Sequence, residues 1–187
     1  MRRTSWGWSV LLGVGLALSG GTDVRANPMA VRFPDGRVAF NVPPTFYEAN
    51  TPYPTVWYPQ PIYRFLLRVS ENAGEPLHRV MIQQLPSQEA LFFEVGRTRA
   101  FSGVRGRQPL SISNVEFNLD QQAVMITFDP PISPGTTLTI VLAPRRNPAY
   151  EGVYLFGITA YPPGGDRAIG QFIGTGRLQF YRNSDYF

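Results

Sequence analysis

The stretch VMITFDPPISPGTTLTIVL, residues 124–142, decides the fold class, because it joins two alternating runs through a turn rich in Pro. Large apolar side chains occupy every second position of residues 124–128 and again of residues 137–142. Successive side chains of a strand point to opposite faces, so this period predicts two half-buried β-strands. Pro cannot donate a hydrogen bond within a central strand, so the three prolines of residues 129–135 predict that the chain leaves the sheet there.

Alternation recurs at residues 63–69 and 79–83, residues 90–95 are short and aromatic, and residues 153–161 are apolar on both faces, as in a central strand. Further strands are predicted at residues 63–69, 79–83, 90–95, 110–117, 153–161 and 172–181. The 18 prolines argue against an all-helical protein, because Pro removes a backbone donor and clashes with the preceding helical turn. About eight short strands separated by turns rich in Pro and Gly predict an all-β protein, an antiparallel immunoglobulin-like β-sandwich.

Residues 1–26 are predicted to be an export signal peptide. Arg2 and Arg3 precede a short apolar run, and Val24-Arg25-Ala26 supplies the small residues typical of a cleavage site. The apolar run is roughly half as long as a membrane-spanning helix, although an uncleaved anchor is the alternative. We therefore expect export to the periplasm, the cell surface or the extracellular space. The remaining chain then divides into an extended arm over 27–61 and a β-sandwich domain over 62–187.

The segment 27–61 is unusual because aromatic residues alternate with prolines in its second half. The stretch from Pro43 to Pro61 contains six prolines, these two included, and Trp57 and Tyr58 are among its five aromatic residues. Pro fixes φ and disfavours regular strand pairing, so we expect an extended or polyproline-like arm. Its rings either cover one edge of the domain or remain exposed and contact a partner or the face of a sugar.

Composition excludes several kinds of chemistry. The chain has no Cys and one His, which excludes disulfides, thiol catalysis, Cys-ligated zinc and multi-His metal sites. We expect neither a metal nor a cofactor. The formal net charge is +4, and three of the arginines, Arg2, Arg3 and Arg25, lie in the expected signal peptide. The charge of the rest therefore does not predict a nucleic-acid partner.

Arginines cluster around two glycines after the third predicted strand. They are Arg97, Arg99, Arg105 and Arg107, with Gly103 and Gly106 between them, and Arg145-Arg146 is a smaller cluster of the same kind. Guanidinium groups bind carboxylates and phosphates through paired hydrogen bonds. The cluster predicts a loop that binds an anionic polysaccharide, a membrane surface or another envelope protein. The other interpretation is ordinary solubilising charge beside a turn.

Catalytic residues are not evident. His78 has no nucleophile motif near it, and a Ser-type triad needs a base held between two partners. Two carboxylates about 5–9 Å apart hydrolyse glycosides, but no motif pairs any of the acidic residues. The candidates for such a pair are Glu89, Glu94, Glu116, Asp120, Asp129 and Glu151. Gly170, Gly174 and Gly176 lack the spacing of a phosphate loop and predict a bulge or close backbone packing. We favour a non-enzymatic protein, with a two-carboxylate hydrolase of envelope glycans as the alternative.

Several longer motifs resemble a known family. They are Glu71-Asn72-Ala73-Gly74-Glu75-Pro76-Leu77, Thr98-Arg99-Ala100-Phe101-Ser102-Gly103, the stretch from Phe128 to Thr137, Arg146-Asn147-Pro148, the stretch from Gly152 to Pro162, and Gly174-Thr175-Gly176-Arg177. Together they resemble a family of secreted cyanobacterial proteins classed as a domain of unknown function. The resemblance extends from Tyr63 to Tyr181 and implies an exported protein of a photosynthetic bacterium. It implies no activity, ligand or catalytic residue.

Overall fold

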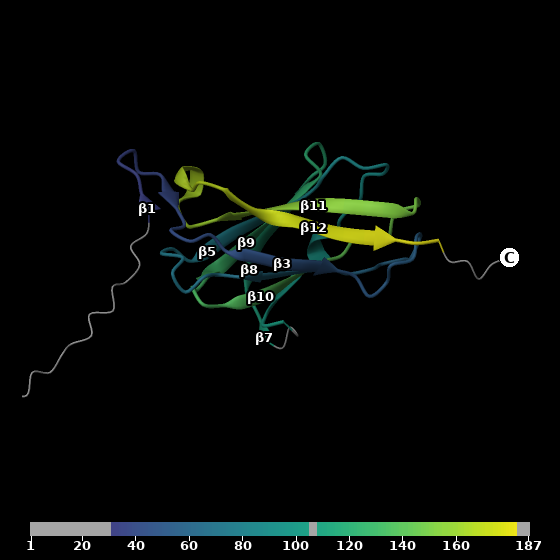
Figure 1. The fold of residues 1–187 in the computed structure, drawn as a ribbon, viewed down its shortest axis with the longest axis horizontal. Coiled ribbons are helices and arrows are strands. Elements are labelled where there is room, and N and C mark those ends of the chain that lie inside the picture. The colour runs from purple at the N-terminus through teal and green to yellow at the C-terminus, as the bar shows by residue number, and fades with distance from the viewer. Residues whose placement is uncertain (1–30, 105–107, 183–187) are drawn as a thin grey trace, which may run out of the picture.

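Two antiparallel sheets of five strands each pack face to face in the computed structural model, which describes residues 31–104 and 108–182 (Figure 1). The first sheet has the order β3 (Thr45–Asn50), β4 (Tyr63–Arg68), β10 (Thr137–Leu142), β6 (Arg99–Ser102), β7 (Gln108–Pro109). The second sheet has the order β12 (Gln171–Phe180), β11 (Gly152–Tyr161), β5 (Leu77–Gln84), β9 (Ala123–Ile132), β8 (Ile112–Asn118). The predicted antiparallel immunoglobulin-like β-sandwich is confirmed.

Short elements complete the described chain. The strands β1 (Val31–Arg32) and β2 (Val38–Ala39) pair with each other at one end of the sandwich (Figure 1). Single turns of 3₁₀ helix occur at η1 (Val95–Arg97) and η2 (Gly165–Arg167). None of the helices in the described residues is long and apolar enough to cross a membrane.

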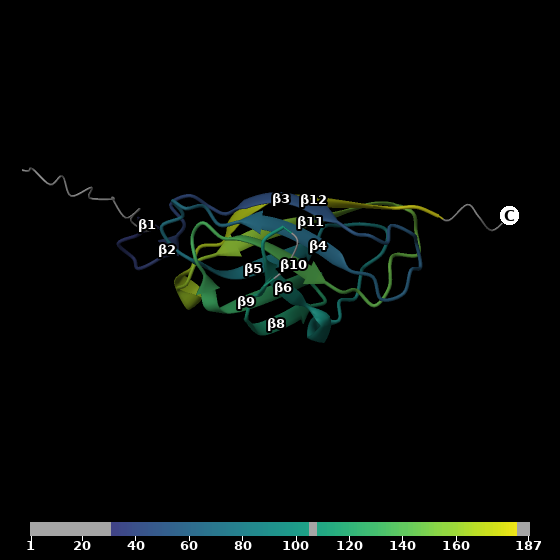
Figure 2. The same cartoon turned by 90° about the horizontal axis from the view of Figure 1, so that it is seen from below.

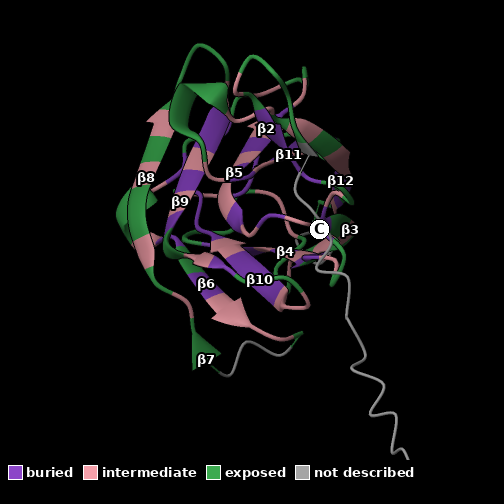
Figure 3. Ribbon diagram, turned by 90° about the vertical axis from the view of Figure 1, so that its left-hand side faces the viewer, coloured by how far each residue is buried: buried purple, intermediate pink, exposed green. Residues whose placement is uncertain are grey.

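The core lies between the sheets and is rich in aromatic rings. Tyr63 and Phe65 of β4 are fully buried and meet Phe156 of β11 edge to face, with ring centroids 6.0 and 5.6 Å away. Figure 3 shows the buried residues gathered on β5, β9 and β10, whereas β8 is largely exposed. The alternation of each strand places these rings inside, where burial of one such side chain contributes about 2–3 kcal/mol.

Glycines of β12 let the two sheets approach closely on one side. Strands β3 and β12 lie side by side there (Figures 1 and 2). A Cβ atom at Gly176 would lie 2.8 Å from the Cβ of Ala49, and one at Gly174 would lie 3.1 Å from the ring of Phe46. The β11–β12 register also shifts beside Gly174, which has φ of +148°. The predicted bulge and close backbone packing are confirmed at these two glycines.

The prolines after Phe128 do not end their strand, contrary to the sequence prediction. Strand β9 continues to Ile132 and includes Pro130 and Pro131. The register with β5 shifts at this point, between the pairs Arg79–Thr127 and Leu77–Ile132. The prolines thus lie in a bulge, which is where a sheet accommodates residues without a backbone donor.

Two other segments differ from the sequence prediction. Residues 90–95 were predicted as a strand, but only an isolated bridge between Phe93 and Pro144 forms before η1 begins. Conversely, residues 45–50 of the expected extended arm form β3, which pairs with β4. This window is free of proline, since Pro43, Pro44, Pro52 and Pro54 flank it. Residues 51–62, which join β3 to β4 and are here called the arm loop, contain only isolated bridges.

We expect Gly176→Ala to lower the free energy of unfolding by about 1–3 kcal/mol, because the added methyl group overpacks the β3–β12 contact. Urea unfolding measures the change. Gly96→Ala is the matched control, since a Cβ there would meet no atom within 4 Å. Equal stability of the two variants would contradict close packing at Gly176.

Candidate functional site

The arm loop is held at the end of the sandwich by Asn147, which is completely buried. The Asn147 amide nitrogen donates to the backbone carbonyls of Tyr53 and Thr55, at 2.5 and 2.7 Å. Its side-chain oxygen accepts a hydrogen bond of 2.9 Å from the Tyr63 hydroxyl in the core. The backbone N–H of Asn147 donates to the carbonyl of Tyr58. These bonds satisfy carbonyl groups that the proline-rich loop cannot pair in a sheet.

Aromatic rings with free faces gather on this loop. We call Tyr53, Trp57, Tyr58 and Arg146 the aromatic end. The rings of Tyr53 and Tyr58 stack with their centroids 4.3 Å apart and 7° between their planes. The Arg146 guanidinium carbon lies 4.2 Å from the centroid of the Trp57 ring, and Arg146 is held in turn by Glu89 at 2.7 Å. Trp57 remains 60% exposed, so one face of its indole is backed by a cation and the other is open to solvent.

The backbone of the arm loop is strained at two positions. Trp57 and Gln60 have φ values of +62° and +49°, which side-chain-bearing residues rarely adopt. Such a conformation costs about 1–2 kcal/mol per residue. Hydrogen bonds from Trp57 N–H to the Pro148 carbonyl and from Gln60 N–H to the Arg145 carbonyl hold it in place. Strain of this kind clusters at functional sites, where the surrounding structure fixes an unfavourable conformation.

Arg97 and Arg99 line a groove on the outer face of the first sheet, and Arg64 lines it with them. The β4–β10–β6 register places Arg64 and Arg99 on either side of Val141. The groove has a volume of about 700 Å³. We call it the arginine groove; its lining residues are Glu48, Asn50, Ile62, Arg64, Arg97, Arg99, Phe101, Val104, Thr139 and Val141.

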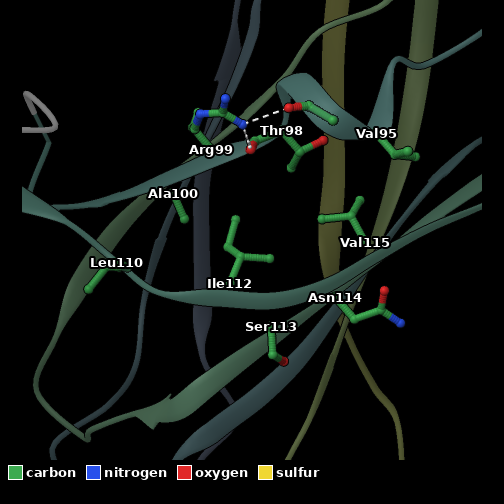
Figure 4. Close-up of a pocket in the computed structure, with 10 residues that line it drawn as sticks. Val95, Thr98, Arg99, Ala100, Leu110, Ile112, Ser113, Asn114 and Val115 are labelled. Carbon is green, nitrogen blue, oxygen red and sulfur yellow. Dashed lines mark hydrogen bonds between the residues drawn. The ribbon is translucent and has the colours of Figure 1, made fainter.

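The three guanidinium groups of the groove differ in their contacts. Arg97 pairs with Glu94 at 3.1 Å and donates to the Gln60 carbonyl. Arg99 donates to the backbone carbonyls of Gly96 and Thr98, at 2.9 and 2.7 Å, as Figure 4 shows. Within residues 31–104 and 108–182, Arg64 forms no ion pair and donates no side-chain hydrogen bond. Arg64 is therefore available to an anionic ligand.

A second hollow, between η1–β6 and β8, adjoins the groove at Arg99 (Figure 4). It has a volume of about 420 Å³ and separates the edges of the two sheets. Leu110, Ile112 and Val115 line one side of this hollow. Thr98 lines the other side, and its buried hydroxyl has no hydrogen-bond partner among the described residues.

The residues predicted to bind a ligand thus fall into three groups. Trp57 and Tyr58 belong to the aromatic end, and Arg97 and Arg99 belong to the arginine groove. Arg105 and Arg107 lie outside the described residues. The sequence pattern did not single out Arg64, because Arg64 occupies an ordinary polar position of an alternating strand.

Two of the acidic residues near these sites are engaged by arginines. Glu89 and Glu94, two candidates for a catalytic pair, each form an ion pair with an arginine. His78 is partly buried, and its Nδ1 has no hydrogen-bond partner among the described residues. Within that part of the chain, no group of three or more His, Asp or Glu side chains is placed to hold a metal ion.

Burial affects the titration of two tyrosines beside the aromatic end. Burial raises the pKa of the Tyr63 hydroxyl far above its usual range, and the nearby Tyr154 and Glu89 raise it further. Burial, followed by the negative charge of Glu89, also raises the pKa of Tyr154. Both hydroxyls therefore stay neutral and act as hydrogen-bond donors, Tyr63 to Asn147 and Tyr154 to the Tyr150 carbonyl.

The family described as "Protein of unknown function (DUF2808)" matches residues 37–180. The chain belongs to this family. The expected resemblance to a domain of unknown function is confirmed to that extent. The match begins before Tyr63, so the DUF2808 domain includes β3 and the arm loop as well as the strands that follow. No curated protein matches the chain.

Solved structures of bacterial surface proteins resemble the DUF2808 chain weakly. The N-terminal domain of the Streptococcus gordonii adhesin Sgo0707 has a TM-score of 0.49 and 14% identity, covering 77% of this chain and 34% of that chain. The C-terminal domain of the Streptococcus pyogenes antigen I/II-family protein AspA has a TM-score of 0.44 and 11% identity, covering 72% and 46%. The collagen-binding domain from a Staphylococcus aureus adhesin has a TM-score of 0.40 and 10% identity, covering 74% and 98%.

This chain therefore spans about a third to a half of the length of the first two of these structures. Identities of this size do not transfer a function, since one fold serves many unrelated functions.

Asn147→Ala is expected to lower the free energy of unfolding by about 3 kcal/mol, because it leaves buried carbonyls and the Tyr63 hydroxyl without partners. Chemical denaturation measures this loss. Asn114→Ala is the control, since Asn114 is exposed and bonds only the Glu116 side chain. A change within 0.5 kcal/mol for Asn147→Ala, roughly that of a surface substitution, would show that Asn147 does not anchor the arm loop.

The free energy of unfolding should fall as pH rises above about 10. The folded state keeps the Tyr63 proton, because the pKa is raised, while the unfolded chain releases it, so alkaline pH favours unfolding. Tyr63→Phe should weaken this pH dependence, whereas Tyr47→Phe should preserve it because Tyr47 is exposed. Urea titrations between neutral and alkaline pH test this; identical slopes for the Tyr63 variant and the wild type would refute it.

Proposed function

We propose that this DUF2808 protein is an exported, non-enzymatic module of the cell envelope that binds polysaccharide through its aromatic end. The observation that carries the proposal is the open indole face of Trp57, backed by Arg146 at 4.2 Å. The C–H face of a sugar ring is apolar and packs on such a ring, and an aromatic side chain supplies a large contact area.

The aromatic end is preorganised for this role. Arg146 and the Pro148 carbonyl hold Trp57 before any ligand arrives, and Tyr58 is held by its stack with Tyr53. A preorganised surface loses less conformational entropy on binding, so more of the contact energy appears as affinity. The strain at Trp57 supports this interpretation, because the fold fixes an indole in a backbone conformation that is otherwise unfavourable.

A glycan hydrolase is less well supported than a binding module. A two-carboxylate mechanism needs one acid and one base or nucleophile facing each other across the substrate. Two of the candidate carboxylates, Glu89 and Glu94, instead bind Arg146 and Arg97. These carboxylates serve to orient cations, which suits ligand binding.

Trp57→Asn tests the proposal, because Asn tolerates positive φ and lacks the ring. We expect the affinity of the full chain for a neutral glucan to fall at least tenfold, as measured by affinity electrophoresis. Stability should change by less than about 1 kcal/mol, since relief of strain offsets the lost cation–π contact.

Phe172→Asn is the matched control, because Phe172 is 65% exposed on β12 of the second sheet. This variant should bind the glucan like the wild type. Full binding by Trp57→Asn, or an equal loss in both variants, would refute the aromatic end as the binding surface.

A further inference from the structure

We infer that the polysaccharide bound at the aromatic end is acidic, and that Arg64 and Arg99 of the arginine groove bind its carboxylate groups. This inference rests on the proposed function and names the class of its ligand. It depends on a juxtaposition that the sequence pattern did not reveal, two arginines facing one groove from β4 and β6.

The charge of the groove is unbalanced. Among the residues that the structure describes, three guanidinium groups line it, and Glu48 is the one carboxylate that does. Glu48 accepts a hydrogen bond from the Asn50 side chain, and Glu94 compensates only Arg97. Arg64 thus lacks a partner in the described residues although β4 is an interior strand, flanked by β3 and β10. An anionic ligand would supply the missing charge.

The two arginines are spaced to act on one ligand. Arg64 and Arg99 pair with the same residue, Val141, from opposite sides, so two strand spacings, about 10 Å, separate their backbones. Their long side chains can converge above Val141 on one carboxylate of the ligand, or each can bind one of two neighbouring carboxylates of the same polymer. Backbone carbonyls of Gly96 and Thr98 fix the Nη1 atom of Arg99 and leave its other donors for a ligand. A fixed guanidinium loses little entropy when it binds a planar carboxylate through two hydrogen bonds.

The floor of the groove suits a sugar rather than a bare ion. Ile62, Phe101, Val104 and Val141 provide apolar surface in the groove, and Val141 lies between the backbones of Arg64 and Arg99. A uronic acid presents both an apolar ring face and a carboxylate. One sugar unit of such a polymer therefore packs on the apolar surface of the groove and binds a guanidinium group at the same time.

The groove and the aromatic end are neighbours. Ile62 lines the groove and follows Tyr58 by four residues, at most about 14 Å of extended chain. Arg97 lines the groove and donates a hydrogen bond to the carbonyl of Gln60, which lies between Tyr58 and Ile62 in the chain. A polymer of several sugar units therefore spans both surfaces.

The test compares polygalacturonate with a neutral glucan as probes for the full chain. Wild type should bind polygalacturonate more tightly, with an affinity that falls as salt is added, because exposed charges are screened. Arg64→Gln should reduce polygalacturonate affinity about tenfold and leave glucan affinity unchanged. Arg64→Lys should recover only part of the loss, since Lys lacks the paired donors. Trp57→Asn should weaken binding of both polymers.

Arg177→Gln is the control for charge, because Arg177 is exposed on β12 and bonds only the Gln179 side chain. It should bind both polymers like the wild type. The inference is overturned if Arg64→Gln binds polygalacturonate as tightly as the wild type while Trp57→Asn binds it less tightly. That result leaves the proposed function standing. Failure of the wild type to bind either polymer overturns both. The inference is also overturned if the chain binds phosphatidylglycerol vesicles in an Arg64-dependent way but does not bind polygalacturonate. The ligand of the groove would then be a membrane surface.

Discussion

The hydrogen bond between the Tyr63 hydroxyl and the Asn147 side chain joins the core of the sandwich to its candidate binding surface. On one side, the Tyr63 ring packs against Phe156 and Phe180 between the sheets. On the other, Asn147 holds the carbonyls of the arm loop, and its neighbour Arg146 backs the Trp57 indole. The orientation of an exposed ring therefore depends on a buried polar pair, and such pairs are costly to break because their partners cannot reach water.

The sequence predicts the architecture well where alternation is regular. Strands β4 and β10 follow their apolar period closely, since each has one face against the core. The errors arise where sheet context overrides local preference. Pro130 and Pro131 remain in β9 because a bulge removes the need for their missing donors, and β3 forms because its window lacks proline. Neither the bulge nor the pairing partner is visible in one sequence.

The candidate site is only partly predictable for a related reason. The residues Trp57, Tyr58, Arg97 and Arg99 stand out by composition, as aromatics among prolines and arginines among glycines. Arg64 does not stand out, because its significance comes from the register. The register places Arg64 opposite Val141, and Arg99 lies on the other side of Val141. Register is set by contacts between strands far apart in the chain, so local patterns specify which residues face outward but not which of them meet.

The irregularities of the edge strands also govern how this molecule behaves at high concentration. Register shifts interrupt β3 after Phe46, β8 after Ile112 and β12 at Gly174, and β7 consists of two residues, one of them Pro109. A continuous ladder of free N–H and C=O groups would invite another copy to extend the sheet, and bulges, Pro and short edges prevent this. The fold is thereby protected from amyloid-like stacking, and self-association through these edges is disfavoured relative to contacts made by side chains.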